Sequence, residues 1–286
     1  MTILLSSVHK AEAMTLGSGF SARHIELSLL GGAADPIVAF DDYRMRTVTF
    51  APHPHAGFSA VSYVFEDSSG GLRNRDSLGN DFVVGPGGIV WTQAGAGVQH
   101  DELPDEDGRE VRGLQIFINL SAAAKETPPQ IHRASGAEIP EEITGGGSRI
   151  RVVVGDHGAS SSKVQPVEPV RLLDMAVAAN DVIDVPLESG HNLVAYCVSG
   201  GARLSASGTM RDLGQGDYLA ASAPERNGVL QIASPSGAQL VLLSGKALNE
   251  PVVQYGPFIM TSGAQVRAAA ARYQSGAMGR LEPLPH

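Results

Sequence analysis

The sequence predicts an all-β chain that folds into two related β-barrels, and three observations support this. Glycine is frequent, with 34 residues among 286, and 17 prolines accompany it, a composition that favours tight turns between short strands. Apolar and polar residues alternate with a period of two in several short segments. A strand, a Gly-rich turn and a new strand occur in both halves, at 60–89 and at 193–218. This internal repeat indicates two copies of one barrel.

Short strands follow one another through the first half, from about 36 to 119. At 61–65, the side chains alternate with the period of two that is typical of a strand. Turn signals separate further strands, with turns expected at 75–80 and 85–88 and strands at 89–91 and 114–118. Such regular spacing is typical of an antiparallel sandwich or barrel.

The second half continues this pattern after a connecting stretch. Residues 121–148 contain two prolines in succession and the run Gly145-Gly146-Gly147, so we expect them to join the two barrels. Strands resume at 150–154. The others are expected at 172–178, 182–185, 193–198, 218–221, 229–232 and 240–243.

The end of the chain changes period. Ser262 precedes a capping box that ends at Gln265, and the Ala-rich segment 266–273 is expected to be helical. Beyond Gly276 the chain is polar and contains proline, so we expect it to be mobile. The predicted organisation is an N-terminal barrel at 1–135, a linker at 136–149, a C-terminal barrel at 150–260, and a helix and tail at 261–286.

Composition limits the classes of partner and compartment. The formal charge of −9 and the pI of about 5.4 disfavour direct nucleic-acid binding, which needs a basic face. The apolar start, Met1 to Ser6, is too short for a signal peptide, and no apolar run approaches a membrane span. The lone Cys197 lies in an apolar run and is expected to be a buried small hydrophobe. We therefore expect a cytoplasmic protein.

Two dense clusters of metal-ligand residue types carry the chemistry. They are His53-Pro54-His55 and His100-Asp101-Glu102. Residues i and i+2 of a strand point to one face, so each cluster presents two ligands together while Asp101 points away and is expected to be solvated. Three imidazoles and one carboxylate suit Fe, Ni, Cu, Mn or Zn and leave positions open for a ligand. A closed structural zinc site is less favoured because no thiolate is present.

The remaining candidates have simpler interpretations. A lone His-x-His pair is usually two surface or hydrogen-bonded histidines, and only the two clusters together favour a metal. Gly95-Ala96-Gly97 is expected to be a turn, because no P-loop lysine or βαβ context follows it. Phe65, Phe82, Trp91 and Phe117 are candidate pocket aromatics, although apolar strand residues more often belong to the core. The isolated histidines, expected to be structural or exposed, are His9, His24, His132, His157, His191 and His286.

Motifs around these clusters resemble the pirin family of bicupins. The resemblance covers the chain from about Arg44 to Tyr273. It is carried by the segments 53–58, 75–80, 85–87, 91–104, 113–120 and 249–260, which begin with His53-Pro54-His55-Ala56-Gly57-Phe58. The chain departs from the family at Ala56 and Ser59, where many members carry a basic residue and a Glu, so it is a divergent member.

The resemblance implies two cupin barrels packed face to face, with a metal in the N-terminal barrel and none in the C-terminal one. The implied ligands are His53, His55, His100 and Glu102, and the implied metal is Fe(2+), with other divalent transition metals as alternatives. Several family members oxidise the flavonol quercetin with O₂. Others act as redox-dependent regulators of transcription factors or metabolic enzymes.

Three functional hypotheses follow. The first is a quercetin 2,3-dioxygenase-like oxidoreductase that opens a flavonol ring with O₂, with Glu102 taking the hydroxyl proton. The second is a non-enzymatic iron-dependent redox sensor that acts through contact with a regulatory protein partner. In the third, the metal only joins strands, and replacing His55 by Ala costs stability alone.

Overall fold

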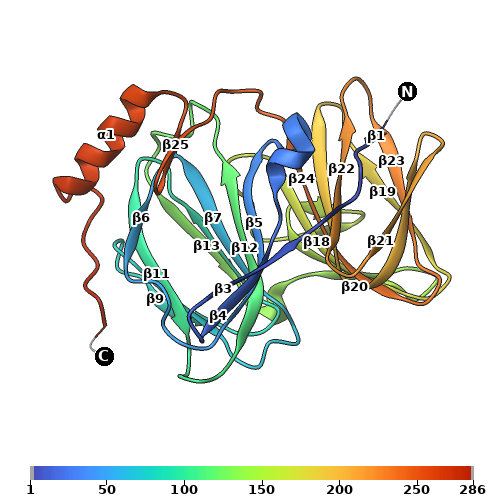
Figure 1. Cartoon of the computed structure of the whole chain (residues 1–286), viewed down its shortest axis with the longest axis horizontal. Helices are drawn as coiled ribbons and strands as arrows, with labels where there is room; N and C mark the ends of the chain where they lie inside the picture. The colour runs from blue at the N-terminus through green and yellow to red at the C-terminus, as the bar shows by residue number, and fades with distance from the viewer. Residues whose placement is uncertain (1–2, 285–286) are drawn as a thin grey trace. The chain divides into compact units, whose positions relative to one another are not determined.

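A computed structural model gives the fold of this chain, and residues 3–284 are described (Figure 1). Strands predominate, as the glycine-rich, period-two sequence predicts. Two compact units form. We call Ala13–His24, Ile37–Glu138 and Leu248–His286 the N-terminal barrel, and Met1–Glu12, Ile25–Pro36 and Ile139–Ala247 the C-terminal barrel. The prediction of a β-rich chain with two units and a short C-terminal helix is confirmed.

The N-terminal barrel contains two antiparallel sheets. The larger sheet has the order β13-β10-β7-β12-β5-β4-β3, and the smaller has the order β6-β11-β8-β9. Their strands are β3 (Glu12–Leu16), β4 (Phe20–His24), β5 (Ile37–Met45), β6 (His53–His55), β7 (Phe58–Val64), β8 (Leu72–Asp76), β9 (Asp81–Val84), β10 (Ile89–Gln93), β11 (Val98–Pro104), β12 (Val111–Asn119) and β13 (Gln130–Ala134).

Strand register brings the chemistry-bearing residues together. In the smaller sheet, His53 of β6 lies opposite His100 of β11, and Glu102 of β11 lies opposite Asn74 of β8. In the larger sheet, β7 and β12 are direct neighbours. Because side chains alternate between the two faces of a pleated strand, residues two apart on each strand present their side chains to the same face.

The C-terminal barrel is built on an eleven-stranded sheet that follows the path β1-β22-β20-β24-β18-β15-β14, with β2, β19, β21 and β23 paired off this path. Its aliphatic core consists largely of Leu, Val, Ile and Ala. The elements are β1 (Leu4–Leu5), β2 (His9–Lys10), η1 (Leu27–Ala34), β14 (Glu141–Ile143), β15 (Arg149–Val154), β16 (Asp156–His157), β17 (Ser160–Ser161), β18 (Val170–Val177), β19 (Val182–Leu187), β20 (His191–Ala206), β21 (Thr209–Gly214), β22 (Asp217–Ala223), β23 (Gly228–Ala233) and β24 (Ala238–Lys246). The short helix η2 (Gly136–Glu138) still belongs to the N-terminal barrel.

The end of the chain returns to the N-terminal barrel. It forms β25 (Val253–Tyr255), β26 (Phe258–Met260) and α1 (Gly263–Gln274), the helix labelled in Figure 1. The predicted helix cap is confirmed, because the Ser262 side chain accepts a hydrogen bond from the Gln265 backbone N–H. The tail after α1 was expected to be mobile, yet Ser77 Oγ donates a hydrogen bond to the Met278 carbonyl at 2.6 Å. Met278 is itself buried, so this part of the tail is packed.

Three expectations differ from the observed chain path, and the first concerns residues 248–260, which were expected in the C-terminal barrel but belong to the N-terminal one. The stretch 121–148 was expected only to connect the barrels, but it includes β13, which pairs with β10 at one edge of the larger sheet. Polar residues and partial exposure hide this strand in the sequence, because an edge strand needs few apolar side chains. Residues 3–12 were grouped with the first barrel, but β1 and β2 pair with β22 of the C-terminal barrel.

Within the described residues, no helix is long and apolar enough to cross a membrane. His286 and the first two residues of the apolar start lie outside the described part of the chain.

Candidate metal centre

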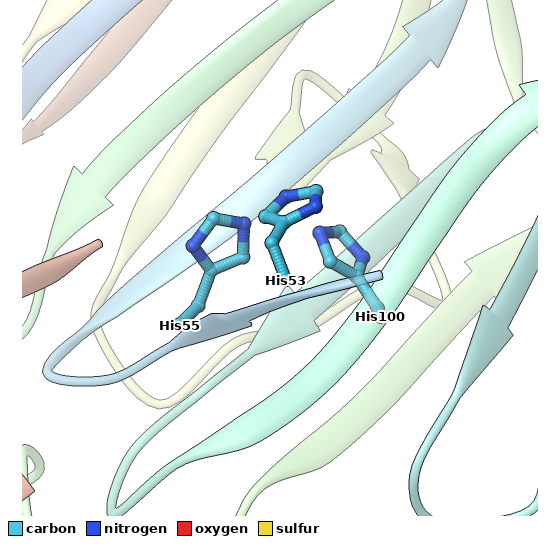
Figure 2. A group of neighbouring side chains, drawn as sticks. All are labelled: His53, His55 and His100. Carbon is cyan, nitrogen blue, oxygen red and sulfur yellow. The ribbon is translucent and has the colours of Figure 1, made fainter. Parts of the chain in front are cut away.

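Three histidines converge where β6 and β11 pair. His53 and His55 lie two residues apart on β6, and His100 faces them from β11. Figure 2 shows the three imidazole rings turned toward one another, and one ring nitrogen of each lies within 4.8 Å of the others. The period-two argument therefore predicts this cluster correctly, since the three side chains share one face of the paired strands.

Hydrogen bonds orient two of the rings. His53 Nδ1 lies 2.9 Å from the Ala51 carbonyl oxygen, and His100 Nδ1 lies 3.4 Å from Asn74 Oδ1. An Nδ1–H that donates to such an oxygen leaves the lone pair on Nε2 free to bind a metal. His55 Nδ1 is buried and has no hydrogen-bond partner among the described residues.

Burial keeps the imidazoles of His55 and His100 neutral. Loss of hydration lowers the pKa of His55 well below its usual value, and the neighbouring His100 and His53 lower it further. Burial, with His53 beside it, lowers the pKa of His100 to about 3. A neutral imidazole offers a lone pair at neutral pH, so this cluster has the electronic state that a metal requires. The donor set therefore fits a transition-metal ion.

Glu102 lies beside the cluster, not in it. It points to the same face of β11 as His100, but it is not among the side chains whose donor atoms lie within 4.8 Å of one another. Its Oε2 accepts a hydrogen bond of 2.7 Å from Ser62 Oγ. Burial raises the pKa of Glu102 to about 7, although the bond from Ser62 opposes this rise. Glu102 can therefore exchange a proton near neutral pH.

The environment of Asp101 differs from the one predicted. It points away from the cluster as expected, but it is buried, not solvated. Its carboxylate forms a salt bridge with Arg75 of β8, the residue directly opposite on the neighbouring strand. The pairing removes the cost of burying each charge alone, and a sequence-based argument that considers only β11 cannot find this partner.

A cavity of roughly 240 Å³ opens onto the cluster. Its walls are mostly apolar, and its lining residues are Met14, Phe20, Ala22, Asp41, Tyr43, Met45, Phe50, His53, His55, His100, Glu102, Gln115 and Phe117. Of the four candidate aromatics, Phe117 lines it. Phe65 and Trp91 are core residues, and the ring of Phe82 packs under the Arg133 guanidinium.

The two positions that depart from the family motif lie outside the cavity lining. Ala56 is fully buried and packs with Phe258, Met260 and the helix residue Val266. A long basic side chain would have no room in this cluster, which accounts for the small residue. Ser59 is buried on the face of β7 opposite to Ser62, because the two positions differ by an odd number.

Several residues near the site were missed from the sequence. Asn74 contacts His100, Ser62 contacts Glu102, and Gln115 contacts Ser62, while the Ala51 carbonyl orients His53. Their only sequence signal is a polar side chain at an inward position of a strand. The isolated His24 also has a partner, since its Nδ1 lies 2.7 Å from Asp41 Oδ1.

Family models match both halves of the chain. Pirin matches residues 9–118, and the pirin C-terminal cupin domain matches residues 172–279. A Pseudomonas aeruginosa protein, whose name gives quercetin 2,3-dioxygenase as its proposed activity, is 32% identical over 243 residues, covering 83% of this chain and 82% of that protein. Mouse pirin is 29% identical, covering 86% of this chain and 83% of its own length.

Solved structures share the fold. The crystal structure of a quercetin 2,3-dioxygenase from Acinetobacter baumannii matches with a TM-score of 0.84 at 22% identity, covering 99% of this chain and 100% of that one. A bacterial pirin from Escherichia coli in complex with nickel(II) matches with a TM-score of 0.64 at 17% identity, covering 86% of this chain and 99% of that one. With both family models and a relative above 30% identity in agreement, this chain belongs to the pirin family of bicupins.

Proposed function

We propose that this chain is a metal-dependent dioxygenase that acts on a flavonol such as quercetin. The observation that carries the proposal is the position of three converging histidines at an apolar cavity of roughly 240 Å³. A planar aromatic ligand fits apolar walls, and its oxygen atoms need a polar end at which to bind. The names of the Pseudomonas and Acinetobacter relatives support this choice of substrate class.

The proposed ligands are His53, His55, His100 and Glu102. Three imidazole nitrogens and one carboxylate oxygen suit iron(II), our first choice, and equally accommodate nickel, manganese, copper or zinc. Iron(II) bound there would supply a Lewis acid for the substrate oxygens and a centre able to activate O₂.

Glu102 is the proposed base. Because burial raises its pKa to about 7, its carboxylate is basic enough to take the proton of an acidic flavonol hydroxyl and to hold it nearby. The ring of Phe117 lines the cavity wall and lies 4.6 Å from that of Phe58, at an interplanar angle of 47°. Such a wall excludes water and favours a flat ligand.

The test is anaerobic loading of the protein with iron(II), followed by measurement of O₂ uptake in the presence of quercetin. We expect turnover above an equal concentration of free iron. Glu102→Gln keeps an oxygen donor but removes the base, so kcat should fall by about 100-fold or more. His132→Ala, away from the cavity lining, serves as the matched control and should keep full activity. Turnover equal to free iron would exclude the proposal.

A second candidate is an iron-dependent redox sensor that binds a regulatory protein. The observation that favours it is the apolar rim of the cavity, where Met14 is 45% and Phe50 is 41% exposed. A one-unit change in charge at a site close to such a rim can alter affinity for a partner. Capture of candidate partners by the reduced and oxidised protein should then differ, whereas equal capture in both states would contradict the switch.

A further inference from the structure

We propose that Ser62 and Gln115 form a hydrogen-bond relay that positions Glu102 by holding one of its two carboxylate oxygens. Ser62 Oγ lies 2.7 Å from Glu102 Oε2 and 3.0 Å from Gln115 Oε1. Ser62 is 1% exposed, so water does not compete for its hydroxyl. This inference deepens the proposed function, because it rests on Glu102 serving the histidine cluster as ligand or base.

The relay joins the two sheets of the N-terminal barrel. Ser62 of β7 and Gln115 of β12 are direct cross-strand partners in the larger sheet. Glu102 belongs to β11 of the smaller sheet. The pairing of β7 with β12 therefore fixes the position of the Ser62 hydroxyl. The Glu102 carboxylate reaches this hydroxyl from the smaller sheet. A hydroxyl held in this way has little freedom to follow a rotating carboxylate.

The single hydroxyl hydrogen of Ser62 determines which group donates and which accepts at each contact of the relay. A serine hydroxyl carries one hydrogen and cannot donate fully to two oxygens at once. The amide oxygen and nitrogen of a glutamine have nearly the same shape, so the hydrogen-bond network decides which way the amide faces. If the Gln115 amide is turned over, its Nε2–H donates to Ser62 Oγ and Ser62 donates to Glu102 Oε2. Each of the two contacts then joins one donor to one acceptor.

The consequence for Glu102 is a carboxylate with two unequal oxygens. Oε2 is occupied by Ser62, while no partner of Oε1 is described for residues 3–284. Glu102 lines the cavity together with the histidines. The relay therefore leaves a single oxygen for a metal or for a substrate proton and prevents the carboxylate from presenting both. Ser62 and Gln115 are positioning residues, since they act through Glu102.

The chain offers a matched control for this role. Ser59 lies on the same strand, is also fully buried, and its hydroxyl has no hydrogen-bond partner among the described residues. Ser59→Ala removes the same atom as Ser62→Ala but from the opposite face of β7. Ser62→Thr keeps the hydroxyl on a residue that strands accept well.

The first test uses cobalt(II) as the metal probe, with affinity measured by chelator competition and coordination followed by the visible absorption spectrum. We expect Ser62→Ala to weaken cobalt binding by about 10–100-fold, the usual effect of losing a group that orients a ligand, and to change the spectrum. Ser62→Thr should restore both, and Ser59→Ala should match the wild type. A Ser62→Ala protein with wild-type affinity and spectrum, or a Ser59→Ala protein equally weakened, would overturn the relay.

The second test needs no metal. In protein selectively labelled at glutamine, one Gln115 side-chain amide proton should exchange slowly with water in the wild type and in Ser62→Thr. It should exchange fast in Ser62→Ala, with the backbone spectrum otherwise preserved. A Gln115 amide that is unprotected in the wild type, or protected in both, would contradict the relay. Neither test uses a flavonol, so failure of turnover and failure of the relay are separate results.

Discussion

At the scale of single residues, burial prepares the site. The same loss of hydration lowers the pKa of His55 and His100 and raises that of Glu102, because in each case it disfavours the charged form. Two neutral imidazoles, those of His55 and His100, and a carboxyl group that can gain or lose a proton near neutral pH follow from this single cause. Asp101 is also buried, and its carboxylate is paired with the opposite charge of Arg75.

Cys197 gives a prediction at this scale. It is fully buried, and burial raises the pKa of its thiol to about 11. Because the thiolate is the reactive form, only about one molecule in a thousand would carry it at pH 8. We expect negligible reaction with an aromatic disulfide reagent in the native protein and one full equivalent after unfolding in urea. Rapid reaction of the native protein would show that this strand opens.

At the scale of elements, the short strand β6 depends on what surrounds it. It has three residues. Ala56, the residue after it, pairs with Phe258 of the C-terminal strand β26. The Lys125 side chain joins these segments, since its ammonium group donates to the carbonyls of Gly57 and Ile259 at 2.6 and 3.0 Å. The position of two candidate ligands therefore depends partly on Ile259, which lies 134 positions from Lys125 in sequence.

A substitution at Gly57 tests the close contact between β26 and the segment that follows β6. It has a φ of 84°, and a Cβ there would lie 2.0 Å from the Ile259 carbonyl oxygen. Gly79 has a similar φ of 93° but open space around it. A left-handed backbone costs an alanine about 1–2 kcal/mol, so Gly79→Ala should lose that much stability by urea denaturation. Gly57→Ala should lose clearly more, and equal losses would argue against the close contact.

A substitution at Lys125 tests the hydrogen bonds that its ammonium group donates to these segments. Its ammonium also donates to the Asn119 side chain, and the residue is fully buried. Lys125→Met would leave these acceptors without a donor, at about 1–3 kcal/mol each, so unfolding free energy should fall by about 3 kcal/mol or more. Lys10→Met removes an exposed ion pair with Asp217 and should cost at most about 1 kcal/mol. Similar losses of unfolding free energy in both variants would contradict a stabilising role for the buried hydrogen bonds of Lys125.

At the scale of the whole molecule, the chain divides into two compact units, and the histidine cluster belongs to one of them. A ligand that binds only the folded state stabilises the unit that holds it. The absence of a metal from the C-terminal barrel was a sequence-based expectation and stays a prediction.

Hydrogen exchange can separate the two units. At a metal concentration of 100 times Kd, binding contributes about 2.7 kcal/mol, so amides of β6 and β11 should become more protected when metal is added. Amides of β18 and β24, in the C-terminal barrel, should not change. His55→Ala should abolish the difference. Equal protection of both units would indicate metal binding outside the histidine cluster.

The sequence by itself determined the features that depend on local spacing and motif. The i, i+2 spacing placed His53 with His55 and put Asp101 on the other face, and the capping box defined the start of α1. The motifs identified the family. Each of these follows from a few neighbouring residues, because strand and helix periods are properties of the local backbone.

Only the tertiary structure decided what depends on strand pairing and on burial. It paired β1 and β2 with β22, gave Asp101 the partner Arg75, packed the tail against Ser77, and brought Ser62 and Gln115 to Glu102. These contacts join residues that are distant in sequence. Spacing carries no information about them, because the partner of a strand and the depth of a side chain are set by the packing of the whole sheet.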